Sequence, residues 1–160
     1  MRRFLKTRPR QIWRSWYIFF FQIPWLAETI FCALDFYLGT RALLRSSRPG
    51  TFSAHDLAQY RTAWSQPRAL ASMINWYRAA GRYRTRFADK TVRVPTRILW
   101  GERDQFLMSE MARESLRYCM HGELCSFPDA THWLQHEEPA KVSELLVKFF
   151  LSGSPPSETT

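Results

Sequence analysis

The amino-acid sequence predicts an α/β fold whose sheet is incomplete within this chain. Two short β-rich runs occur late, at residues 94–101 and 123–127, and each is followed by a segment of helical periodicity. The order strand, helix, strand, helix is typical of α/β proteins. Two parallel strands alone would leave edges unpaired and apolar surface open, so we expect most of the sheet to lie outside this chain.

Residues 11–45 predict two helices, because aromatic blocks alternate there with short polar breaks. The second helix is expected from about Leu26 to Leu44, with Gly39 as its weak point. The segment is apolar on more than one face. We therefore expect it to be sandwiched between other elements or to line a pocket.

Two further helices are expected before the first strand. Ser53, with Asp56 three positions later, is typical of an N-cap before a helix that ends at Trp64. Residues 66–81 begin with Gln-Pro and carry apolar side chains at helical spacing. Residues 1–90 are thus predicted to form one helical region.

Residues 91–151 are predicted to form a second region, of the α/β type. The run 94–101 is expected to be a buried strand, because it is too short for an ordinary helix and ends at a glycine. A helix over 109–119, a strand over 123–127 and an amphipathic helix over 139–151 are expected to follow. Residues 152–160 contain two prolines and no apolar residue, which predicts a disordered tail.

The net charge of +9 is unevenly distributed. Residues 1–100 hold 18 Lys and Arg against 4 Asp and Glu, whereas residues 101–160 hold 5 against 10. A basic excess of this kind is typical of nucleic-acid or membrane partners. The arginines are scattered among apolar positions, however, and no DNA- or RNA-binding motif occurs, so we expect no nucleic-acid partner.

The N-terminal segment imitates a membrane anchor. Basic residues precede an apolar run at 16–27, but Gln22 and Pro24 interrupt this run and Glu28 ends it. It falls short of the roughly 20 apolar residues that a spanning helix needs, so no membrane insertion is expected.

Cysteine use indicates the redox setting. The chain has three cysteines, without a Cys-x-x-Cys pair or a histidine cluster at metal spacing. This argues against a disulfide framework and against a metal site, and it favours a cytoplasmic location. We expect no metal and no cofactor.

A candidate acid and a candidate base follow the two predicted strands. Asp104 comes after the first strand and His132 after the second. The carboxyl end of a strand is where sheet enzymes place catalytic groups, and a histidine can act as a general base when a carboxylate holds its other ring nitrogen. The alternatives are that Asp104 caps a helix or pairs with Arg103, and that His132 is structural or solvated.

Both residues lie within motifs that resemble those of a known family. Residues 94–104 read Val-Pro-Thr-Arg-Ile-Leu-Trp-Gly-Glu-Arg-Asp, and residues 130–139 contain Ala-Thr-His-Trp followed by Gln-His-Glu-Glu-Pro. This pair resembles the C-terminal motifs of the epoxide hydrolase and haloalkane dehalogenase branch of α/β-hydrolases, which also order the acid before the histidine. Residues 15–26 and 75–78 resemble two segments of that family's helical cap.

The resemblance extends to Leu151 and implies a partial α/β-hydrolase fold. Residues 1–90 would form the helical cap, and residues 91–151 the last strands and helices of the core. The implied mechanism is covalent: an aspartate attacks an epoxide carbon, a cap tyrosine donates to the opening oxygen, and a histidine-activated water hydrolyses the ester.

Three residues of this chain match roles in that mechanism. His132 would activate the water, Asp104 would orient the imidazole, and Tyr77 would be the cap tyrosine. The alternative for Tyr77 is a core aromatic whose hydroxyl is hydrogen-bonded. The implied substrate is a small apolar electrophile.

The chain departs from the family in its first cap tyrosine. Family members commonly use two, but Phe19 and Phe20 occupy the nearest positions, and Tyr17 lies too far along to take that place. This departure leaves room for an ester or a halide substrate.

The chain also contains no Gly-x-Asp-x-Gly and no Gly-x-Ser-x-Gly motif. We therefore expect the nucleophile, Asp or Ser, to lie in a missing N-terminal half of the core, and this fragment alone to be inactive. The rival hypotheses are a non-catalytic, degenerate relative whose open sheet edge pairs with another chain, and a basic membrane-surface protein anchored through residues 13–27.

Overall fold

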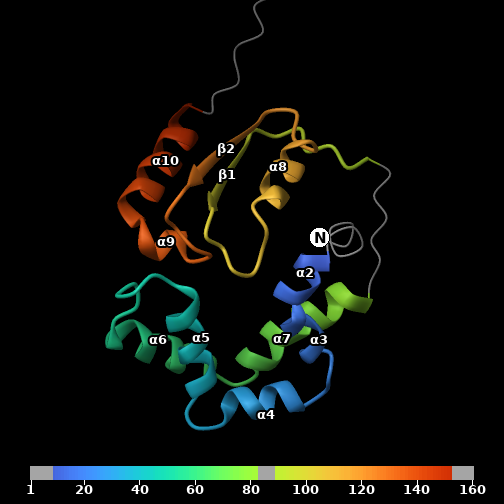
Figure 1. Ribbon diagram of the computed structural model, residues 1–160, viewed down its shortest axis with the longest axis vertical. Helices are drawn as coiled ribbons and strands as arrows, with labels where there is room; N and C mark the ends of the chain where they lie inside the picture. Colours follow the sequence, from blue (N-terminus) through green and yellow to red (C-terminus); the bar gives the residue numbers. More distant parts are fainter. Residues whose placement is uncertain (1–8, 83–88, 153–160) are drawn as a thin grey trace, which may run out of the picture.

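The computed structural model describes residues 9–82 and 89–152; the predicted disordered tail, apart from its first residue, lies outside them. The elements are α2 (Pro9–Arg14), α3 (Trp16–Phe20), α4 (Leu26–Cys32), α5 (Tyr37–Ser46), α6 (Ala54–Trp64), α7 (Ala69–Arg82), β1 (Thr96–Gly101), α8 (Glu110–Leu116), β2 (Gly122–Phe127), α9 (Leu134–Glu137) and α10 (Pro139–Ser152). Figure 1 shows α2–α7 gathered on one side of the region that holds β1 and β2. Among these helices none is long and apolar enough to cross a membrane.

The strands β1 and β2 are parallel and pair from Thr96↔Gly122 to Gly101↔Phe127. They lie between α8 and α10 (Figure 1), and the chain therefore has the strand–helix–strand–helix order of a partial α/β fold. The expectation that β1 is buried is wrong for this chain. Its residues 96–100 are half-exposed, because β1 has no partner other than β2 within the described ranges.

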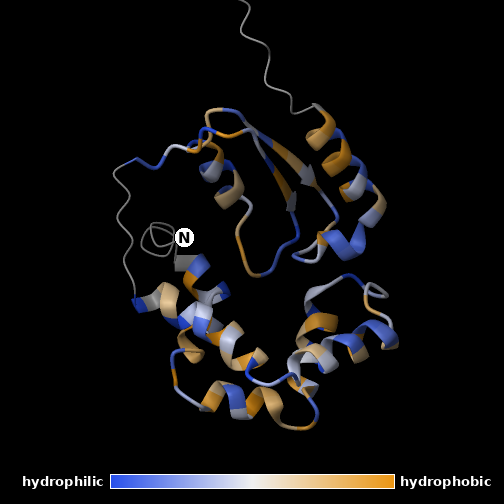
Figure 2. Ribbon diagram, turned by 180° about the vertical axis from the view of Figure 1, so that it is seen from behind, coloured by the Kyte–Doolittle hydropathy of each residue, from blue (hydrophilic) through white to orange (hydrophobic). Residues whose placement is uncertain are grey.

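A small core joins the sheet to α10. Phe127, Ala130 and Val142 are its buried members, and Leu99 and Leu145 pack against it. Figure 2 shows that α10 is largely hydrophobic. Part of this hydrophobic surface stays open, since Leu146 is 39% and Phe150 74% exposed.

The helical region has a separate core of Ala27, Phe36, Leu70 and Ile74. The single helix predicted over residues 26–44 is wrong, because the structure divides it into α4 and α5. Leu34, Asp35 and Phe36 separate these helices with left-handed backbone angles, φ of 53°, 54° and 58°. Neither glycine nor proline marks this break, so local sequence signals did not reveal it.

Gly39 was expected to weaken the helix, but it lies inside α5 and is buried. A Cβ at this position would lie 2.8 Å from Cζ3 of Trp64. The glycine therefore permits close packing of α5 against α6.

The predicted N-cap of α6 is confirmed. The Ser53 hydroxyl accepts a hydrogen bond from Asp56 N, and Asp56 Oδ2 accepts one from Ser53 N at 2.8 Å. This is a capping box, which satisfies two backbone donors at the helix start. The next helix, α7, begins later than predicted, after Arg68 with a φ of 64°.

Candidate active site

Asp104 and His132 meet where the two strands end. His132 Nδ1 lies 2.8 Å from Asp104 Oδ2. Because β1 and β2 are parallel and Gly101 is in register with Phe127, the loops that follow them leave the same edge of the sheet. The alternative in which Asp104 pairs with Arg103 is wrong, since Arg103 pairs with Asp129 at 2.6 Å.

The carboxylate of Asp104 is buried, at 7% exposure, and both of its oxygens have partners. Oδ1 accepts hydrogen bonds from the backbone N–H groups of Phe106 (2.7 Å) and Leu107 (3.0 Å), which leaves Oδ2 for His132. An ionised carboxylate can only accept, so Nδ1 of His132 carries the donated hydrogen. In that tautomer Nε2 of the imidazole is an acceptor, as a general base requires.

Gly101 allows the two loops to approach each other. A Cβ at this position would lie 2.1 Å from the carbonyl oxygen of Thr131 and 2.6 Å from that of Ala130. The neighbouring Arg103 N donates to Ala130 O at 3.0 Å. Gly101 therefore leaves space for the backbone that carries His132.

Helix α2 fixes the loop that carries Asp104. The fully buried side chain of Gln11 donates to Phe106 O at 2.7 Å and accepts from Met108 N at 3.0 Å. Arg14 Nη1 donates to Asp104 O at 3.0 Å. The helical region therefore positions the acid, which the sequence did not reveal because α2 and this loop lie far apart in the chain.

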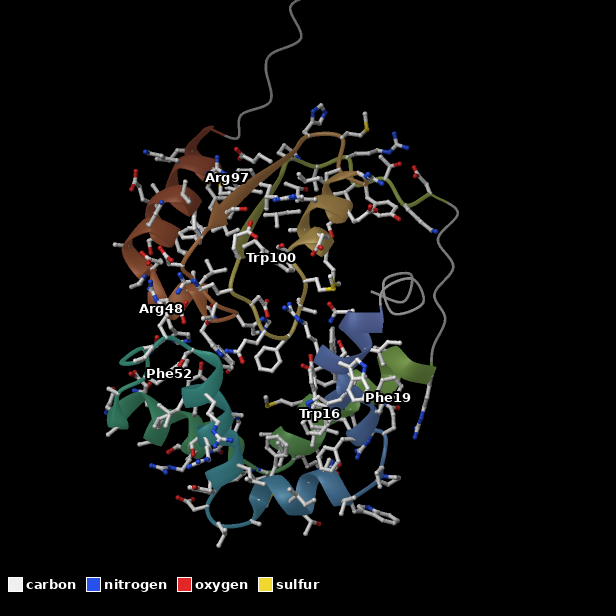
Figure 3. The ribbon with its side chains drawn as sticks, in the orientation of Figure 1. Trp16, Phe19, Arg48, Phe52, Arg97 and Trp100 are labelled. Carbon is white, nitrogen blue, oxygen red and sulfur yellow. The ribbon has the colours of Figure 1, made fainter. Side chains whose placement is uncertain are left out.

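Glu137 of α9 fixes the loop that carries His132. Its buried carboxylate accepts hydrogen bonds from Thr131 N at 2.6 Å, the Thr131 hydroxyl at 2.7 Å and Arg48 N at 2.8 Å. Arg48 precedes α6, and Figure 3 shows it close to α9. Burial acts to raise the pKa of Glu137, but these hydrogen bonds and the Arg48 charge outweigh it and lower the pKa. Glu137 lies in the motif Gln-His-Glu-Glu-Pro, but nothing in the sequence indicates this role.

A cavity of about 620 Å³ lies between the helical region and the loop after β2. His132 borders it, together with aromatic side chains from several elements: Trp16, Tyr17, Phe20, Phe21, Phe31, Tyr77, Phe106 and Trp133. Figure 3 shows Trp16 on the helical side of this region. A concave, mostly apolar cavity with few polar groups is typical of a small-molecule site. Residues 11–45 were expected to be sandwiched between other elements or to line a pocket, and several of them line this cavity.

Tyr77 lines this cavity, and so does Tyr17. Their ring centroids lie 5.8 Å apart in an edge-to-face arrangement. Tyr17 also contacts Phe106, with centroids at 5.8 Å, and Phe106 contacts His132 at 5.1 Å. Tyr17 was expected to lie too far along the chain to take the place of the first cap tyrosine, and it nevertheless lines the cavity beside Tyr77. One helical turn places Tyr17 on the same face as Phe20 and Phe21, and this i, i+3, i+4 spacing was the signal in the sequence.

Both tyrosines stay protonated well into alkaline solution. Burial, with the nearby Tyr77 and Asp104, raises the pKa of Tyr17 to about 12, and burial raises the pKa of Tyr77. Neither hydroxyl forms a hydrogen bond within residues 9–82 and 89–152, which argues against the structural role considered for Tyr77. Both hydroxyls can therefore donate to a molecule in the cavity.

Arg78 connects the elements that carry the two tyrosines. From α7 it donates to the carbonyl oxygens of Phe21 (2.8 Å) and Ile23 (3.0 Å), and it pairs with both carboxylate oxygens of Glu28 at 2.5 and 3.0 Å. The bond with Arg78 lowers the pKa of Glu28. A planar guanidinium suits such a buried, multidentate position.

No family model matches the chain. It is, however, 37% identical over 141 residues to AB hydrolase superfamily protein YfhM of Bacillus subtilis, with 88% of this chain and 49% of that protein covered. It is 35% identical over 152 residues to human epoxide hydrolase 4, covering 91% of this chain and 42% of the relative. The chain thus spans about half the length of the curated relatives it matches.

Solved structures agree on the fold. Bacillus megaterium epoxide hydrolase, in complex with an inhibitor, is similar with a TM-score of 0.77 at 22% identity, covering 92% of this chain and 55% of that one. An epoxide hydrolase from metagenomes of hot environments has a TM-score of 0.72 at 21% identity, covering 92% and 53%. The fold is therefore that of a partial α/β-hydrolase, and most of the chain is similar in sequence to proteins named as AB hydrolase and epoxide hydrolase.

Proposed function

We propose that this chain is the cap and C-terminal core portion of an epoxide hydrolase-like enzyme, with residues 1–90 as cap and 91–151 as core. The observation that carries the proposal is the 2.8 Å contact between His132 Nδ1 and Asp104 Oδ2 at a cavity that Tyr17 and Tyr77 also line. A candidate base, which Asp104 holds from behind, and two tyrosines thus border one largely apolar cavity.

In this proposal His132 is the general base. Nδ1 is engaged by Asp104, so Nε2 accepts a proton from a water molecule in the cavity. Asp104 stabilises the imidazolium that forms and keeps the ring in the productive tautomer.

Tyr77 and Tyr17 are proposed as the donors to the epoxide oxygen. When a carboxylate nucleophile attacks one ring carbon, the ring C–O bond at that carbon breaks, its electron pair passes to the epoxide oxygen, and a tyrosine proton neutralises the alkoxide. Two protonated hydroxyls on one wall favour an epoxide over an ester or a halide. Water activated by His132 then attacks the enzyme ester and releases a diol.

The nucleophile would come from sequence outside this chain, since no nucleophile motif occurs in these 160 residues. The chain alone is therefore expected to bind but not to turn over a small apolar epoxide. Its partner is then the remaining half of the hydrolase core.

The test is to read the coding sequence upstream in the same frame and to express the longest open product. Styrene oxide hydrolysis is measured for this full-length product, for His132→Ala, for Tyr77→Phe and for the 160-residue chain. Activity in the full-length product that both substitutions reduce supports the proposal. A stop codon directly upstream, or activity that survives His132→Ala, contradicts it.

A further inference from the structure

Two large apolar side chains flank α4 and point into solvent. Trp25, directly before the helix, is 82% exposed, and Leu34, just after it, is 81% exposed. The helix has seven residues, so its two ends lie about 10 Å apart. Figure 2 shows hydrophobic residues at both ends of α4. One short helix therefore presents two apolar side chains that the fold does not cover.

The backbone at both positions is strained. Trp25 has a φ of 60° and Leu34 a φ of 53°, a region that large side chains rarely adopt. Asparagine would fit this backbone and water at a lower free-energy cost. Since these side chains contribute little to the core, the strain indicates a contact with something outside the chain.

The helical region around α4 is strongly basic. Residues 9–82 contain nine arginines against three acidic residues. Each acidic side chain already has a partner: Glu28 pairs with Arg78, Asp35 with Arg61, and Asp56 belongs to the capping box of α6. Most of the positive charge of this region is therefore left without an acidic partner inside it.

Arg68 places one such charge beside α4. It directly precedes α7, whose Leu70 packs with Ala27 of α4 in the core of the helical region. Arg68 is exposed, and its guanidinium forms no hydrogen bond or ion pair with residues 9–82 or 89–152. A free cation thus lies next to the exposed apolar side chains.

The missing half of the core does not account for these side chains. Its strands would add to the edges of the β1–β2 pair, and Figure 1 places α4 at the end of the molecule far from both strands. A second copy of the chain would bring like charge against like charge. An anionic lipid surface matches both features, because tryptophan is enriched at membrane interfaces and anionic lipids attract arginine.

We propose that this end of the helical region docks on the surface of an anionic phospholipid bilayer. Trp25 and Leu34 insert among the lipid headgroups, and Arg68 contacts a headgroup phosphate. The contact is peripheral and needs no spanning helix. It involves neither His132 nor the nucleophile, so it stands apart from the proposed function.

The test is co-sedimentation of the 160-residue chain with two kinds of vesicle at low salt. One contains phosphatidylcholine and phosphatidylglycerol at about 3:1, and the other phosphatidylcholine alone. Binding to the anionic vesicles is expected to be about tenfold tighter and to weaken as salt is added. Trp25→Asn with Leu34→Asn is expected to weaken it by about tenfold or more, while thermal denaturation shows an intact fold.

Val94→Asn with Met120→Asn is the matched control. These apolar side chains are 66% and 57% exposed, on the segments before β1 and β2, which Figure 1 shows at the other end of the molecule. This variant should bind anionic vesicles as the parent protein does. Arg68→Gln should weaken binding about fivefold, whereas Arg113→Gln on α8 should leave it unchanged.

The full-length product should bind anionic vesicles as well, since α4 lies away from the sheet. Failure of either protein to sediment with them, equal binding to both lipid compositions, or equal loss in the test and control variants would overturn the inference. Self-association without vesicle binding, measured by analytical ultracentrifugation, would also overturn it and would indicate a second copy as the occupant. Retained vesicle binding without hydrolysis by the full-length product would contradict the proposed function alone.

Discussion

Glu137 accepts a hydrogen bond from the backbone N–H of Thr131 at 2.6 Å, and Thr131 directly precedes His132. The same carboxylate accepts from Arg48 N, in the segment between α5 and α6, at 2.8 Å. One buried side chain thus connects the helical region to the loop of the candidate base. The position of His132 relative to the cavity depends on this connection.

Glu137→Gln is expected to lower the free energy of unfolding by about 1–3 kcal/mol, because an amide N–H₂ would face a backbone donor and leave it unpaired. Hydrogen bonding lowers the Glu137 pKa in the folded state, so its contribution is present above the ordinary value of 4.5 and is lost as pH falls through the folded value. Urea denaturation at neutral pH and at pH below 4.5 measures both effects.

The matched control for this prediction is Glu114→Gln, which removes the pair with the exposed Arg117 and should change stability little. The difference in the free energy of unfolding between the parent protein and Glu137→Gln should become smaller at acidic pH. A difference that stays constant across this pH range would show that the charge of Glu137 is not involved.

Asp104→Asn should reverse the tautomer of His132. Since Phe106 N and Leu107 N both donate to Oδ1, the amide oxygen of asparagine takes that position, and its N–H₂ faces Nδ1 of His132. The imidazole hydrogen then moves to Nε2, which can no longer accept a proton. Nitrogen-15 NMR should detect this tautomer, and hydrolysis by the full-length product should fall by about 10³–10⁴-fold. An unchanged tautomer would contradict the assignment.

Tyr17→Phe and Tyr77→Phe should each lower kcat/KM of the full-length product by about 10²-fold, and the double variant by more. Stability at neutral pH should change little, because neither hydroxyl has a protein partner in the described residues. Wild-type activity after Tyr17→Phe would exclude it as a donor.

Tyr17 has a second, spectroscopic signature. Its pKa is raised to about 12, so it contributes stability below the ordinary value of 10.0 that is lost as pH rises between the two. Alkaline titration of phenolate absorbance should therefore contain a late component near pH 12 that Tyr17→Phe removes. The same substitution at the exposed Tyr37 should leave this component in place.

Gly101→Ala should destabilise the fold by about 1–3 kcal/mol, because its Cβ would overlap the Thr131 carbonyl oxygen at 2.1 Å. Gly50→Ala serves as the comparison, since that Cβ meets no atom within 4 Å and only the φ of +81° opposes it. A larger loss at Gly50 in thermal denaturation would mean that backbone strain outweighs the steric overlap.

Local signals predicted a substantial part of this fold. The cap at Ser53, the parallel strands and the pairing of Asp104 with His132 follow from motifs whose geometry is set by neighbouring residues. The left-handed residues Leu34 to Phe36 were missed, because packing of Phe36 into the helical core and not residue type sets this backbone. Tertiary contacts overrode local propensity there.

The structure also shows parts of the site that no local sequence pattern predicts. The role of Gln11 depends on atoms of Phe106 and Met108, about a hundred positions away. The position of Tyr17 at the cavity depends on the helix face on which it lies, which distance along the sequence does not show. In both cases the missing information was three-dimensional.

The hydrogen bonds of Gln11 have a consequence for synthesis of the chain. Its partner Met108 lies 97 positions later, so at typical translation rates of about 5–20 residues per second the ribosome needs roughly 5–20 s to deliver it. During that time α2 exposes a polar group whose native acceptor and donor do not yet exist. The loop of Asp104 therefore assembles only late in translation, after the helices around α4 and α7 have been made.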